Sequence, residues 1–251
     1  MSLTGHLIEL RKRLVRSALA IGLGAIMGWL VTDLVWGALE QPVRIITEAH
    51  NRSAQLVFPT VTGAFDLRLQ IAVTLGVILA SPIWLYQAFA YFVPALTRIE
   101  RRYVFGFFFS AVPLFLAGCA SGWLLLPHMV TLLTSFVPSG SASFLDAVTY
   151  YQFVLKLMLA VGVAYVVPVF LVLLNFMGVL SAQAIIRNWR FAILGILTFA
   201  AIATPAADIV SMFLLAIPMV ALYLLAWVIA AVHDRRAAKR AAAMLADSGL
   251  A

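Results

Sequence analysis

Long apolar runs separated by short polar stretches dominate the pattern of the chain. Six such runs cover about residues 17–39, 67–89, 104–126, 151–179, 191–203 and 209–232. A helix that spans a bilayer needs about 20 mainly apolar residues. The run at 191–203 is shorter than that, and it suits either a short span in a thinned bilayer or a re-entrant helix. We expect a span, because six spans place both basic ends of the chain on one side.

The composition excludes a soluble protein. Hydrophobic residues make up 64% of the 251 residues and charged residues 11%, against about 45–50% and about 25% in soluble domains. So few charged side chains cannot cover a surface in water, and a single cysteine, Cys119, excludes a disulfide scaffold. We therefore predict an all-α, polytopic membrane protein with six transmembrane helices.

The positions of the 17 lysines and arginines predict the orientation. Most of them precede the first run, separate the second from the third and the fourth from the fifth, or follow the sixth. Cytoplasmic loops of membrane proteins carry such an excess of positive charge. We predict that both termini are cytoplasmic, with one membrane domain at 1–236 and a basic cytoplasmic tail at 237–251.

The first 14 residues have the pattern of an amphipathic helix. Leu3, Leu7, Leu10 and Leu14 recur at helical spacing, so they can lie on the membrane or pack against neighbouring helix ends. The apolar run that follows is longer than the roughly 7–15 residues of a signal peptide. We therefore expect a retained first span.

Five prolines fall within or beside the predicted spans: Pro82, Pro113, Pro168, Pro205 and Pro218. Each removes a helical hydrogen bond and crowds the preceding turn, so each predicts a kink or break. Together they favour a kinked, concave bundle.

Few ionisable residues fall near the middle of the apolar runs. Lys156, with Gln152 one turn before it, either snorkels to the headgroups or serves a wet groove. Asp208 is a candidate N-cap for the sixth span, a role that is compatible with a function of its own. Metal-site, nucleophile and nucleotide motifs are absent, so we expect no enzyme activity, no cofactor and no metal.

Two glutamates lie inside basic clusters at the predicted cytoplasmic face. Glu9 precedes Arg11, Lys12 and Arg13, and Glu100 precedes two arginines. In a helix, Glu9 and Arg13 pair at i,i+4 for about 0.2–0.5 kcal/mol. The local arginines either simply neutralise the two carboxylates, or hold them for guanidinium groups of a basic peptide ligand.

Four aromatic residues precede Glu100: Tyr86, Phe89, Tyr91 and Phe92. They either form the interfacial aromatic belt or line an apolar groove beside that carboxylate, where a ring can stack on an arginine.

Segments 6–14 and 81–102, together with Pro42, Thr204, Asp208 and Pro218, resemble the TatC family in the same order along the chain. TatC is the core subunit of the twin-arginine protein translocase. The resemblance implies a receptor for twin-arginine signal peptides in the cytoplasmic membrane. It implies that the protein works with single-span TatA- and TatB-type partners and associates with copies of itself, and that it binds no nucleic acid. It also implies transport of folded proteins, driven by the proton-motive force.

The resemblance also implies roles for particular residues. Those implied to bind the signal peptide are Glu9, Arg11, Tyr91, Leu96, Glu100 and Arg101. Those implied to act at the outer face or within spans are Pro42, Pro82, Tyr86, Gln87 and Asp208, and those implied to dock partner helices are Thr204, Met212 and Phe213.

The chain departs from the family pattern at several positions. Tyr91 stands where the family has Phe, and Met212 stands where a Gln is often found. Val166 and Leu224 replace glutamates that many members carry, so we expect a depleted polar cavity. The alternative function is a secondary transporter of a small solute. Such a transporter usually shows repeated halves and a midplane ionisable site, and this chain shows neither.

Overall fold

The protein is a bundle of long helices with one short strand pair, seen in a computed structural model that describes residues 3–49, 54–58, 60–92, 101–135, 143–204 and 208–247. The helices are α1 (Leu3–Ala49), α2 (Gly63–Leu79), α3 (Ser81–Phe92), α4 (Arg101–Ser135), α5 (Ala147–Phe176), α6 (Ala182–Arg187), α7 (Trp189–Ala203) and α8 (Ile209–Asp247). The strands are β1 (Ala54–Val57) and β2 (Ser143–Asp146).

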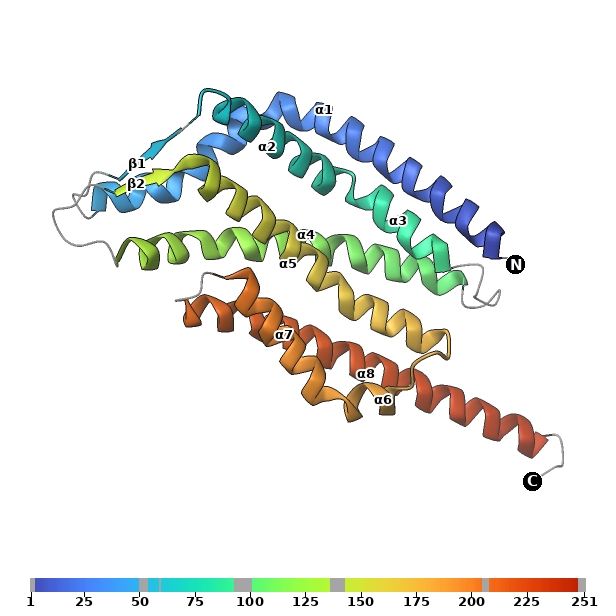
Figure 1. The fold of residues 1–251 in the computed structure, drawn as a ribbon. Helices are drawn as coiled ribbons and strands as arrows, with labels where there is room; N and C mark the ends of the chain where they lie inside the picture. Colours follow the sequence, from blue (N-terminus) through green and yellow to red (C-terminus); the bar gives the residue numbers. More distant parts are fainter. Residues whose placement is uncertain are drawn as a thin grey trace.

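The helices run lengthwise through one elongated body (Figure 1). The first turns of α1, the end of α3, the start of α4 and the end of α8 lie at one end, which we call the basic end. The strands, the start of α5, the end of α7 and the start of α8 lie at the other end, which we call the strand end. The body therefore has two polar ends, separated by apolar helix.

The six predicted apolar runs correspond in order to helical segments. Among the described residues, four helices are long and apolar enough to cross a membrane, within α1, α4, α5 and α8. The predicted second span consists of α2 and α3, which meet at an angle of 55°. Helix α7 has 15 residues and is therefore only about 22 Å long. The predicted helical membrane fold is thus confirmed, with α7 as a short apolar helix.

The bend between α2 and α3 lies beside a proline, and a tryptophan side chain stabilises it. Pro82 follows the break at Ala80 and has no N–H to continue the helical ladder. The indole Nε1 of Trp84 donates to the carbonyl oxygen of Val77, in the last turn of α2, at 2.9 Å. Where a membrane helix breaks, side chains can supply hydrogen bonds of this kind to the backbone.

The break predicted at Pro82 is confirmed, and the kinks predicted at the other prolines stay predictions. Pro113, Pro168 and Pro218 lie inside helices that continue past them. Pro205 lies outside the described residues. Among the described prolines, Pro82 is therefore the one beside which the chain turns from one helix into the next.

The N-terminal amphipathic segment is not a separate helix. It forms the first turns of α1, which runs unbroken into the first span, and Leu7 and Leu14 are exposed. The basic tail likewise continues α8 as helix as far as Asp247.

The two long connections at the strand end pair with each other, which the sequence did not predict. β1 and β2 form a parallel pair with Ala54 opposite Ser143 and Val57 opposite Asp146. Asp146 also caps α5, because its carboxylate accepts hydrogen bonds from the Val148 N–H and the Thr149 hydroxyl. The bond from Thr149 lowers the pKa of Asp146 below its ordinary value.

Glycines allow close backbone contact along two helix pairs, which we call the glycine seams. Between α1 and α2, a Cβ on Gly28 would lie 2.6 Å from the carbonyl oxygen of Ala72, and one on Gly24 would lie 2.8 Å from that of Gly76. Between α4 and α5, a Cβ on Gly118 would lie 2.7 Å from the carbonyl oxygen of Val161. Side chains do not fit at these distances, so glycine is required by space.

We expect Gly28→Ala to destabilise the protein, because its methyl group would meet backbone atoms. Overpacking of this kind costs about 1–3 kcal/mol. The matched control is Gly22→Ala on the same helix, where an added Cβ meets nothing within 4 Å. Thermal unfolding of the detergent-purified variants measures the effect, and equal melting temperatures for Gly28→Ala and Gly22→Ala would contradict the seam.

Candidate functional site

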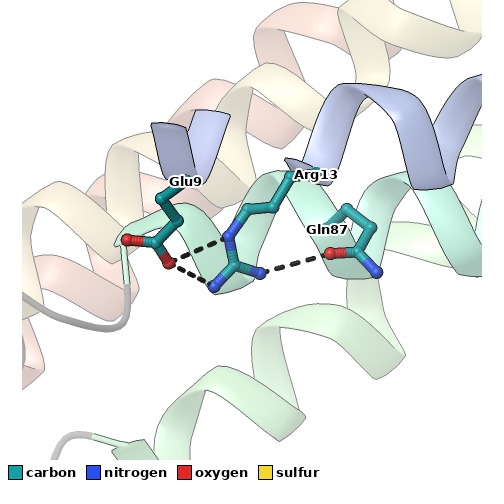
Figure 2. A network of polar contacts seen from close by, with 3 residues as sticks. All are labelled: Glu9, Arg13 and Gln87. Carbon is teal, nitrogen blue, oxygen red and sulfur yellow. Dashed lines mark hydrogen bonds and ion pairs between the residues drawn. The ribbon is translucent and has the colours of Figure 1, made fainter. Parts of the chain in front are cut away.

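The clearest polar network at the basic end joins Glu9, Arg13 and Gln87 (Figure 2). Arg13 donates to Oε1 of Glu9 from Nε at 3.1 Å and from Nη2 at 2.6 Å. Its Nη1 donates to Oε1 of Gln87 at 3.2 Å. The predicted i,i+4 pair on α1 is thus confirmed, and an amide from α3 extends it.

The network holds the Glu9 carboxylate in one orientation at a partly exposed position. The side chain of Glu9 is 22% exposed and that of Arg13 is 19% exposed. Both bonds from Arg13 end on Oε1, so within the described residues no hydrogen bond engages Oε2. A carboxylate has about four lone-pair sites, so Glu9 has acceptor capacity left for another donor.

Helix α3, which carries Gln87, is anchored in the core by its aromatic side chains. Phe89 is fully buried and stacks on Phe170, with ring centroids 4.6 Å apart. Trp84 meets the ring of Phe115 edge-on at 5.2 Å. The suggestion that Phe89 lines a groove is therefore wrong, because its ring belongs to the core. Tyr86 is exposed and packs edge-on against Phe108.

The other residues expected at the signal-peptide site are only partly described. Arg11 is exposed on α1, and Tyr91 is half-buried in the last turn of α3. Leu96 and Glu100 lie outside the described residues. Arg101 begins α4, but its side chain is not described. The end of α3 and the start of α4 lie at the same end of the molecule as Glu9 (Figure 1).

A buried polar group closes the strand end of α8. Asp208 is 2% exposed, and its Oδ1 accepts a hydrogen bond from the backbone N–H of Ser211 at 2.8 Å. The predicted N-cap is thus confirmed. Its Oδ2 and the Ser211 hydroxyl are buried and find no hydrogen-bond partner among the described residues.

The residues expected to dock partner helices differ in exposure. Thr204 is buried, and its hydroxyl donates to the carbonyl oxygen of Ala200 at 2.9 Å, so it does not face outward. Met212 is half-buried and Phe213 is exposed. Exposed apolar side chains, including Ile202 and Ile217, extend the face on which Phe213 lies along α7 and α8.

The middle of the bundle is apolar. Val166 is buried against α3 and α4, and Leu224 is exposed on α8. A groove of about 650 Å³ between α5, α6, α7 and α8 is lined almost entirely by apolar side chains.

Lys156 is exposed on α5, an arrangement compatible with snorkelling. Pro42 lies within α1, and its side chain is not described.

One polar residue of structural importance was missed in the sequence. Asp234, which falls outside the apolar run, accepts hydrogen bonds from Nδ2 of Asn175 at 2.9 Å and from the backbone N–H of Ala182 at 2.8 Å. It joins α8 to the turn between α5 and α6. The available signal was an isolated acidic residue beside a basic cluster, the same pattern that singled out Glu9.

Comparison with known proteins gives a consistent result. The family model described as Sec-independent protein translocase protein (TatC) matches residues 5–218. A TatC protein of Xylanimonas cellulosilytica is 42% identical over 242 residues, covering 96% of this chain and 88% of that protein. A TatC protein of Rothia mucilaginosa is 32% identical over 250 residues, covering 99% of this chain and 85% of that protein.

A solved structure agrees with the sequence comparison. A crystal structure of the twin-arginine translocase receptor TatC in the detergent DDM has a TM-score of 0.76 and 27% identity. It covers 90% of this chain and 99% of that chain. The secondary-transporter alternative is not supported, and the chain belongs to the TatC family of Sec-independent protein translocase proteins.

Proposed function

We propose that this protein is the signal-peptide receptor of a twin-arginine translocase in the cytoplasmic membrane, with both termini in the cytoplasm. The observation that carries the proposal is the Glu9 carboxylate, which Arg13 and Gln87 fix at the basic end. The charge distribution supports the orientation, because the first turns of α1 and the late part of α8, at 235–240, are rich in basic residues and lie at the same end (Figure 1).

Glu9 and Glu100 would each receive one guanidinium of the paired arginines. A guanidinium offers five N–H donors in a planar fork, so it binds a carboxylate with defined geometry, whereas lysine offers a point charge. The bonds from Arg13 occupy one oxygen of Glu9 and leave the other for the ligand. Gln87 acts as a positioning residue, because it holds Arg13 from the side opposite Glu9. Tyr91, at the end of α3, would supply an aromatic ring beside the bound arginines.

Single-span partners of the TatA and TatB types would dock on the exposed apolar face of α7 and the start of α8. Phe213 and Ile217 lie on this face. The short length of α7 favours a thinned bilayer beside it. Because Val166 and Leu224 are apolar, the passage of cargo would not use buried carboxylates at these two positions.

We expect Glu9→Gln and Glu100→Gln each to weaken binding of an Arg-Arg signal peptide by about tenfold or more. A hydrogen bond to a charged group contributes about 1.5–3 kcal/mol, and about 1.4 kcal/mol corresponds to a factor of ten in Kd. Fluorescence anisotropy with the purified protein in detergent measures Kd for an Arg-Arg peptide and for its Lys-Lys counterpart.

The matched control is Glu40→Gln, which removes a carboxylate from the same helix at the strand end. It should leave the affinity unchanged. The receptor proposal fails if both Glu9→Gln and Glu100→Gln bind the Arg-Arg peptide as tightly as the unmodified protein does.

Binding of the same peptide should weaken steeply as salt rises. The Glu9 site is partly exposed, and the Debye length falls from about 30 Å at 0.01 M to about 3 Å at 1 M. Titrations across this range measure the slope. A salt-independent Kd would instead indicate recognition by an apolar groove.

A further inference from the structure

An ion pair lies on the outward face of α1 and α2, toward the strand end. Nη2 of Arg68 lies 3.1 Å from Oδ2 of Asp33, and the Asp33 side chain is 80% exposed. Leu30 and Leu34 beside it are 75% and 74% exposed. In a membrane protein, an apolar face this open is in contact with lipid rather than water. The pair is therefore a charged feature at a lipid-facing surface, where ionisable residues indicate function.

Two tryptophans place this pair near the headgroups. Trp29 is four residues before Asp33, so the two share one face of α1. Trp36, three residues after Asp33, borders the same pocket, and its ring also packs on Phe58 and Tyr151. Tryptophan is enriched where the membrane meets water. Arg68 lies five residues after Gly63, the start of α2, which is a depth of about 8 Å along the helix.

The pair borders a pocket of about 520 Å³ with aromatic walls. The lining residues are Trp29, Asp33, Trp36, Ala64, Phe65 and Arg68. The guanidinium carbon of Arg68 lies 5.0 Å from the centre of the Trp29 ring, and the ring of Phe65 meets Trp29 edge-on at 6.1 Å. The pocket thus presents one positive and one negative group beside aromatic surface.

The charges in the pocket have bonding capacity to spare. Nε of Arg68 is buried and has no hydrogen-bond partner among the described residues. A guanidinium has five donors, and the described bond to Asp33 uses one nitrogen. A donor left without a partner away from water is unfavourable. The Arg68 side chain is 39% exposed, so its remaining guanidinium N–H groups can donate to an anionic oxygen in the pocket, and Asp33 can accept from a cation beside it.

We propose that this pocket binds the headgroup of an aminophospholipid of the phosphatidylethanolamine type. Arg68 would take the phosphate oxygens, and Asp33 would accept hydrogen bonds from the ammonium group next to the Trp29 ring. The site carries one charge of each sign and so matches a zwitterion, whereas a lipid with a net negative charge would meet repulsion from Asp33. The lipid belongs to the leaflet at the strand end. This inference rests on the membrane fold and not on the proposed peptide site.

The test measures lipid retention by native mass spectrometry. The purified protein is equilibrated with mixed micelles that contain equal amounts of phosphatidylethanolamine, phosphatidylcholine and phosphatidylglycerol. The unmodified protein should retain phosphatidylethanolamine in preference to the other two lipids. Arg68→Gln should retain about tenfold less of it, and Asp33→Asn should retain phosphatidylethanolamine and phosphatidylcholine equally. The control Lys156→Gln removes an exposed cation from another span and should behave as the unmodified protein does.

Several results would overturn the proposal. One is retention of phosphatidylethanolamine by Arg68→Gln at the level of the unmodified protein. Another is its displacement by inorganic phosphate, which would show a free-phosphate site. Equal retention of all three lipids by the unmodified protein would show only nonspecific binding. If Arg68→Gln fails to fold, Arg68→Lys tests the same point, because it keeps the charge, loses the fork, and should retain less phosphatidylethanolamine.

Discussion

Backbone contact along the glycine seams is the constraint on which the arrangement of the helices depends. Lipid tails are as apolar as leucine, so membrane helices associate through close packing and hydrogen bonds rather than through escape from water. Gly24, Gly28 and Gly76 let α1 and α2 approach to backbone contact, and Gly118 and Gly162 do the same for α4 and α5. The first seam keeps α1 beside the segment that continues into α3. It therefore fixes the distance that the Arg13 side chain has to span to reach Gln87.

The bend at Ala80 converts this packing into a site. An unbroken second span would continue the direction of α2, whereas the 55° bend redirects α3. The bend is stabilised rather than merely tolerated, since Trp84 bonds the carbonyl oxygen of Val77 and also packs on Phe115. Helix α3 is then held by the stacking of Phe89 on Phe170. The side-chain amide of Gln87, which Arg13 contacts, therefore lies on a helix that is itself packed into the core.

The sequence predicted what depends on short-range patterns and missed what depends on contacts between distant segments. Apolar runs located the helices, and i,i+4 spacing located the Glu9–Arg13 pair, because a helix itself places those residues together. The bond from Arg13 to Gln87 joins residues 74 positions apart. The pairing of β1 with β2 and the contact of Asp234 with Asn175 are similarly distant. The spacings Gly24–Gly28 and Gly118–Gly122 were a readable signal for the seams, but they do not name the partner helix.

Five of the described acidic residues fall into two groups, and the grouping separates structural from functional candidates. Asp146, Asp208 and Asp234 accept hydrogen bonds from backbone N–H groups at the starts of α5, α8 and α6. These carboxylates have a structural role, because the N–H groups at a helix start need hydrogen-bond acceptors where water is scarce. Glu9 and Asp33 instead pair with arginine side chains and remain partly or largely exposed. A side-chain pair leaves acceptor positions open to a second cation. Of these five carboxylates, Glu9 and Asp33 are therefore the two with acceptor positions open to a ligand, one toward each end of the molecule.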